Sequence, residues 1–130
     1  MIDKSKITVV DGAMGTSIQN FDLKPSDFGA EEYDGCNEYL NLVNPQYIKS
    51  VHQSFIDVGA DIIQTNSFGG TPMVLDEYGL SDKAEEINFQ SSVIAKSVAS
   101  KNPRTLVAGS MGPTTKLLSL TQIKTNDITF

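Results

Sequence analysis

Three short apolar runs, each followed by a loop of small and polar residues, constrain this chain more than any other feature. The runs lie at 7–10, 60–65 and 105–108, and the loops after them read DGAMGTS, NSFGG and GSMGPTT. Short runs rich in β-branched residues and bounded by glycine are typical of buried strands. The pattern therefore predicts three strands, each of which leads into a loop.

Helical patterns fill most of the space between the predicted strands. The first predicted helix, 45–58, starts after the Asn44-Pro45 cap and ends at Gly59. Its apolar face consists of Ile48, Val51, Phe55 and Val58. A short helix over 71–78 and a longer one from the Ser81 cap to about 100 precede the third strand. The stripe of the longer helix consists of Ala84, Ile87, Ile94 and Val98.

The segment 21–41 differs from the rest of the chain. It is polar, has no sustained period, and is broken by Pro25, Gly29 and Gly35. We expect an irregular excursion over the surface.

Strands that alternate with helices pair in parallel, so the expected fold class is α/β with a parallel sheet covered by helices. Binding groups in such folds gather at the carboxyl ends of the strands. The three loops are thus expected at one functional edge.

Length and charge narrow the function classes. The 130 residues suit one domain, and a net charge of -6 argues against nucleic acid or an anionic membrane as a partner. One cysteine and one histidine cannot form a disulfide or complete a zinc site by themselves. No apolar run has the length of a signal peptide or membrane span, so we expect a cytoplasmic protein.

The first loop lacks the spacing of a dinucleotide or Walker motif. Its glycines expose N–H groups that suit a small anion, while the carboxylate of Asp11 suits an ammonium, and together they suggest an amino acid zwitterion. A phosphate cradle and a simple turn capped by Asp11 remain open. Around the end of the second strand, the stretch QTNSFGG combines short hydrogen-bonding groups with an apolar wall at Phe68, a mixture typical of a small-ligand pocket, or of a capped loop. The hydrogen-bonding groups belong to Gln64, Thr65, Asn66 and Ser67. We interpret His52 as a satisfied core histidine and Cys36 as an inert thiol.

Taken together, the stretches VVDGAMGTSIQ, the run from Cys36 through NPQYIKSVHQSFIDVGADIIQTNSFGG to Leu80, and LVAGSMGPT resemble the homocysteine S-methyltransferase family. The similarity covers nearly the whole chain, and it is strongest to the homocysteine-binding module of cobalamin-dependent methionine synthases. The three separate signals coincide in one order.

The resemblance implies a (β/α)8 TIM barrel in which zinc holds the homocysteine sulfur as a thiolate. In the methionine synthases, that thiolate takes a methyl group from methylcobalamin carried on another module, and a folate module completes the enzyme. By resemblance, the substrate-binding residues are Asp11, Gly12, Ala13, Thr65, Asn66 and Phe68. Gly112 and Pro113 would shape the pocket.

The chain departs from the family in one respect. The family's zinc-binding cysteines lie on later strands, and Cys36 matches none of them. We therefore expect residues 1–130 to be about the first three β/α units of the barrel, cut before the zinc ligands, with no catalytic residue or metal ligand and no activity in isolation. Alternatives are a non-catalytic module completed by a second chain, or by a second copy through an unpaired barrel edge, and a small α/β domain that binds a phosphorylated ligand. Betaine or S-methylmethionine also remain open as methyl donors.

Overall fold

The computed structural model describes residues 5–113, which form an α/β structure around a parallel pair of strands. Strands β1 (Ile62–Gln64) and β2 (Leu106–Ala108) pair in parallel, with Ile63 opposite Val107. The α/β class and the parallel pairing are confirmed.

The predicted strand at 7–10 is shorter than expected. Val10 makes one isolated parallel bridge to Ile62, supported by a 3.1 Å hydrogen bond from the Ile62 N–H to the Val9 carbonyl. Ile7 is 92% exposed, so no packing holds the start of the run in a ladder. The run still brings Asp11 to the edge where β1 ends: the Asp11 N–H donates to the Ile62 carbonyl at 2.9 Å, and the Asp11 carboxylate accepts from the N–H of Gln64, the last residue of β1, at 2.9 Å.

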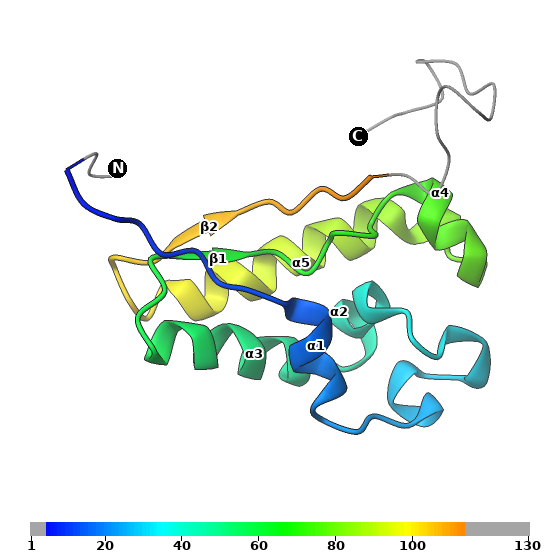
Figure 1. The fold of residues 1–130 in the computed structure, drawn as a ribbon. Helices are drawn as coiled ribbons and strands as arrows, with labels where there is room; N and C mark the ends of the chain where they lie inside the picture. Colours follow the sequence, from blue (N-terminus) through cyan, green and yellow to red (C-terminus); the bar gives the residue numbers. More distant parts are fainter. Residues whose placement is uncertain (1–4, 114–130) are drawn as a thin grey trace, which may run out of the picture.

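Two long helices lie along one side of the strands (Figure 1). These are α3 (Pro45–Asp57) and α5 (Ala84–Ala99), and they pack against each other and against β1. The shorter helices are α1 (Met14–Gln19), α2 (Leu40–Val43) and α4 (Pro72–Leu75). Five 3-10 turns complete the described part: η1 (Pro25–Phe28), η2 (Glu31–Tyr33), η3 (Asn37–Tyr39), η4 (Asp76–Tyr78) and η5 (Ser81–Lys83).

Helix α3 begins at Pro45 as the sequence predicts and ends at Asp57, one residue earlier than predicted; its cap and its buried face also differ from the prediction. The Asn44 side chain makes no capping bond; its amide instead donates to the Asp27 carbonyl. Val58 is 84% exposed; it lies one residue beyond the end of α3 at Asp57, and Gly59, with φ of 100°, then turns the chain toward β1. His52 and Ile56 complete that face instead.

The region from 71 to 100 follows the predicted pattern closely. Thr71 caps α4 by accepting a hydrogen bond from the Val74 N–H at 3.3 Å, and Gly79 ends the following 3-10 turn with φ of 66°. Ser81 does not cap the long helix; it opens a 3-10 turn that runs into α5. The predicted stripe on α5 is buried along its whole length.

The segment 21–41 is not a surface excursion. It contains three 3-10 turns, and it buries Phe28, Cys36 and Leu40. The glycines that suggested irregular structure allow these turns, since Gly29 and Gly35 have φ of 94° and 82°. Turns this short leave no helical period to detect in the sequence.

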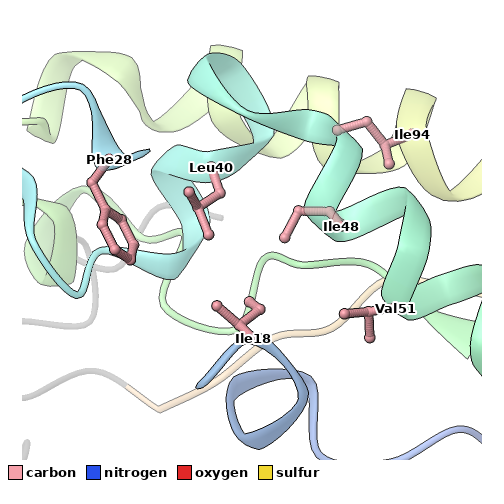
Figure 2. Close-up of a cluster of buried hydrophobic side chains, with 6 residues drawn as sticks. All are labelled: Ile18, Phe28, Leu40, Ile48, Val51 and Ile94. Atoms are coloured by element: carbon pink, nitrogen blue, oxygen red, sulfur yellow. The ribbon is translucent and has the colours of Figure 1, made fainter. Parts of the chain in front are cut away.

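The core forms where this segment meets the long helices. One cluster, shown in Figure 2, joins α1, η1, α2, α3 and α5 through Ile18, Phe28, Leu40, Ile48, Val51 and Ile94. A second cluster packs Cys36 against Leu75, Leu80, Ala84 and Ile87, and a third seats β1 on α3 and α5. These contacts join β1, the helices and the segment 21–41.

Candidate functional site

A cavity of about 360 Å³ opens where the chain leaves the parallel strands. Its lining comes from the three loops and from η3: Asp11, Gly12, Ala13, Met14, Gly15, Asn37, Glu38, Gln64, Thr65, Asn66, Phe68 and Ser110. The six residues predicted to bind substrate all lie in this lining. The expectation that the loops share one edge is confirmed.

Asp11 brings a buried, hydrogen-bonded carboxylate to the cavity. Its carboxylate accepts hydrogen bonds from the Gln64 N–H at 2.9 Å and from Gln64 Nε2 at 3.1 Å, and the residue is only 9% exposed. No hydrogen bond within residues 5–113 uses the N–H of Gly12 or Ala13. A fixed carboxylate therefore lies next to two backbone donors that are open to a ligand.

The Thr65 hydroxyl joins the second loop to the third. It accepts from the Ser110 N–H at 2.9 Å and lies 2.6 Å from the Ser67 hydroxyl. Because Ser67 Oγ donates its proton to the Ser110 carbonyl at 2.8 Å, Thr65 is the donor in the bond to Ser67. Its proton is thus used within the protein, and only acceptor capacity remains for a ligand.

Asn66 is held by a similar network. Its side-chain amide donates to the Asn37 carbonyl at 2.8 Å and to Asn41 Oδ1 at 3.2 Å, while Asn41 Nδ2 donates to the Asn66 carbonyl at 2.7 Å. Asn66 and Asn41 are 4% and 2% exposed. Both amide protons of Asn66 are therefore spent on fixing the loop to η3 and α2.

Phe68 forms the apolar wall and is 59% exposed. Gly112 lies behind it and donates its N–H to the Phe68 carbonyl at 2.9 Å. Gly112 is therefore outside the lining but contacts a residue that belongs to it. Pro113 is exposed and also lies outside the lining.

Sequence reasoning missed the wall formed by η3. Asn37 and Glu38 line the cavity, and Glu38 Oε1 accepts a 2.7 Å hydrogen bond from the Gly69 N–H. The i, i+4 spacing of Asn37 and Asn41 was the available signal, but it lay in a segment that the glycines made look irregular.

A family model of homocysteine S-methyltransferases matches residues 8–130. The chain belongs to the homocysteine S-methyltransferase family. It is 39% identical over 119 residues to methionine synthases from Mycobacterium leprae and Mycobacterium tuberculosis. Those matches cover 88% of this chain and 10% of each relative, so the chain spans about a tenth of their length.

A solved structure adds a likeness of fold. The homocysteine methyltransferase MmuM from Escherichia coli, in its metallated form, superposes with a TM-score of 0.66 at 28% sequence identity. The match covers 85% of this chain and 39% of that one.

In the present chain, neither Cys36 nor His52 lines the cavity described above. Burial raises the pKa of the Cys36 thiol to about 11, and the charge of Glu38 adds to the rise. His52 is fully buried on α3, as expected, yet neither ring nitrogen has a partner within the described residues, so it is not the satisfied histidine we predicted. Burial lowers its pKa, against a smaller opposing effect of Asp11.

The zinc that the family resemblance implies does not fit residues 5–113. Their side chains include no group of three or more His, Cys, Asp or Glu residues that could hold a metal ion. Within the same residues, no helix has the length and apolar character needed to cross a bilayer.

Proposed function

We propose that this chain forms part of the homocysteine pocket of a homocysteine S-methyltransferase and holds the amino acid end of the substrate. The observation that carries the proposal is the pairing of the Asp11 carboxylate with the open N–H groups of Gly12 and Ala13 in one cavity. A zwitterion needs both kinds of partner at close range. Membership of the family supports homocysteine as that zwitterion.

In this pocket Asp11 would accept hydrogen bonds from the ammonium, and Gly12 and Ala13 would donate to the carboxylate. Thr65 and Asn66 would contribute as acceptors, since their protons are engaged elsewhere. Phe68 would cover the methylene groups of the substrate. Gly112 would act by supporting Phe68.

The complete activity is proposed for a longer assembly. We propose that residues 1–130 form about three units of a (β/α)8 barrel, and the superposition on a homocysteine methyltransferase supports this fold. The proposed product of the complete enzyme is methionine. Methylcobalamin on another module is the proposed methyl donor; the resemblance to cobalamin-dependent methionine synthases supports it, and the methionine synthase relatives, about ten times as long as the matched region, leave room for such a module. We assign no step of thiol activation to residues 5–113, because zinc does not fit them. The proposed compartment is the cytoplasm.

A second candidate is a module that is completed by another chain or by a second copy. It is favoured by β2, whose outer edge has no partner strand among residues 5–113 and whose Leu106 and Val107 are 38% and 37% exposed. A phosphate ligand is disfavoured, because Asp11 and Glu38 are the charged residues in the described lining and both would repel it.

The test is calorimetric titration of the 130-residue chain with L-homocysteine and with inorganic phosphate. We expect saturable binding of homocysteine, no binding of phosphate, and at least about a tenfold loss of affinity in Asp11→Asn. Asp76→Asn, which removes an exposed carboxylate outside the cavity, is the matched control. Absence of homocysteine binding by the wild-type chain, or equal affinity in Asp11→Asn, would contradict the proposal.

A further inference from the structure

The charges that line the cavity do not balance those of a zwitterion. Asp11 and Glu38 are both acidic, and the described lining contains no lysine, arginine or histidine. Two carboxylates that share a partly enclosed space repel each other, and a cation placed between them removes that repulsion. The cavity is thus more strongly negative than one ammonium-binding aspartate requires.

An ammonium group presents three N–H donors in three directions. Asp11 lies on one wall, and each of its oxygens already accepts one hydrogen bond from Gln64. This single carboxylate cannot surround all three donors. Thr65 and Asn66 would offer further acceptors, but both are uncharged, and Glu38 is the other carboxylate in the described lining.

Glu38 is placed to be a further, charged acceptor. It lies on η3 and lines the same cavity as Asp11, and the 2.7 Å bond from the Gly69 N–H occupies only its Oε1. The same bond fixes the carboxylate against the loop that carries Phe68. A Cβ built on Gly69 would lie 2.9 Å from Glu38 Oε1, so glycine at 69 is what allows this close approach.

We propose that Glu38 is a second recognition residue for the substrate ammonium, acting with Asp11 to select ligands that carry an α-amino group. The inference rests on the proposed function, because it places an amino acid in this cavity. It adds a residue from the segment 21–41, which sequence reasoning had assigned to the surface.

The experiment compares two ligands and two variants of the 130-residue chain by calorimetry. The ligands are L-homocysteine and 4-sulfanylbutanoate, which is homocysteine without its amino group. Glu38→Gln removes the charge but keeps an oxygen that can accept from the Gly69 N–H. Glu32→Gln makes the same charge change at an exposed position on η2, outside the cavity.

We expect Glu38→Gln to weaken homocysteine binding about tenfold and to leave 4-sulfanylbutanoate binding unchanged or stronger, because the latter ligand is only repelled by Glu38. Glu32→Gln should affect neither ligand. If Glu38 only holds the loop, the variant will weaken both ligands alike or neither, and the inference is wrong while the proposed function stands. If the wild-type chain does not bind homocysteine, the proposed function is wrong and the inference falls with it.

Discussion

At the scale of single residues, the pocket depends on positions where a side chain is absent as much as on those where one is present. A Cβ added to Gly112 would lie 2.5 Å from the Phe68 carbonyl oxygen and 2.7 Å from its ring. Real Cβ atoms do not approach backbone this closely, so the third loop or Phe68 would have to move. Gly109, on the same loop, has nothing within 4 Å of such a Cβ.

These two glycines give a matched pair of variants. We expect Gly112→Ala to lower the free energy of unfolding by about 1–3 kcal/mol and to weaken homocysteine binding, because it displaces the apolar wall. Gly109→Ala should have little effect on either quantity. Urea denaturation and calorimetry measure the two effects, and similar behaviour of both variants would show that Gly112 does not support Phe68.

His52 predicts how stability depends on pH. Burial holds its pKa below the usual 6.5 in the folded chain, so below pH 6.5 the unfolded chain takes up a proton that the folded chain resists. The protonation of His52 should therefore not reduce the free energy of unfolding above pH 6.5. Below pH 6.5 the free energy of unfolding should fall as the pH drops, by at most about 1.4 kcal/mol per pH unit for one proton.

The measurement is urea denaturation at intervals from pH 8 to pH 5. His52→Leu removes the sole histidine of the chain while keeping an apolar side chain on the buried face of α3, so its profile should be flatter over that range. A wild-type profile that is flat below pH 6.5, or a variant that keeps the slope, would contradict this explanation.

At the scale of elements, α5 does more than cover the strands. Near its start, Asn88 Nδ2 donates to the Gly70 carbonyl at 2.7 Å, so the helix anchors the far end of the loop that carries Asn66 and Phe68. Glu38 holds the neighbouring Gly69 from the other side. The loop is therefore fixed by two elements that lie about fifty residues apart in the sequence.

Removing the Asn88 anchor should loosen this loop without unfolding the helix. We expect Asn88→Ala to cost about 1 kcal/mol in the free energy of unfolding, the usual value of one such hydrogen bond, and to weaken homocysteine binding. Glu85→Ala, at an exposed position of the same helix, is the control. If Asn88→Ala binds homocysteine as tightly as the wild type, the anchor does not control the pocket.

Elements with a clear period or cap could be predicted from sequence, and those defined by tertiary contacts could not. Gly59 and Thr71 mark helix boundaries through local geometry, so their positions could be read directly. The 3-10 turns of 21–41 take their places from burial of Phe28 and Leu40 against distant helices, which no local pattern encodes. The place of Glu38 in the cavity lining was missed for the same reason: its carboxylate is held by Gly69, which is 31 residues away.

At the scale of the whole molecule, the described part exposes apolar side chains on the segments that flank β1: Val10 in the bridge on one side and β2 on the other. Val10, Leu106 and Val107 are 48%, 38% and 37% exposed, and the outer edge of β2 is unpaired within residues 5–113. Exposed parallel edges flanked by apolar side chains are sites of association with other chains.

We expect the purified 130-residue chain to self-associate as its concentration rises, which light scattering and sedimentation velocity can follow. Val107→Lys should shift the equilibrium toward the monomer, because a charge on the β2 edge opposes pairing with another strand. Val58→Lys adds the same charge at the end of α3, outside the two paired strands, where the side chain is 84% exposed, and should leave association unchanged. A wild-type chain that stays monomeric at all concentrations would show that this edge does not pair with a second copy, whereas equal effects of the two lysines would indicate that net charge, and not the edge, controls association.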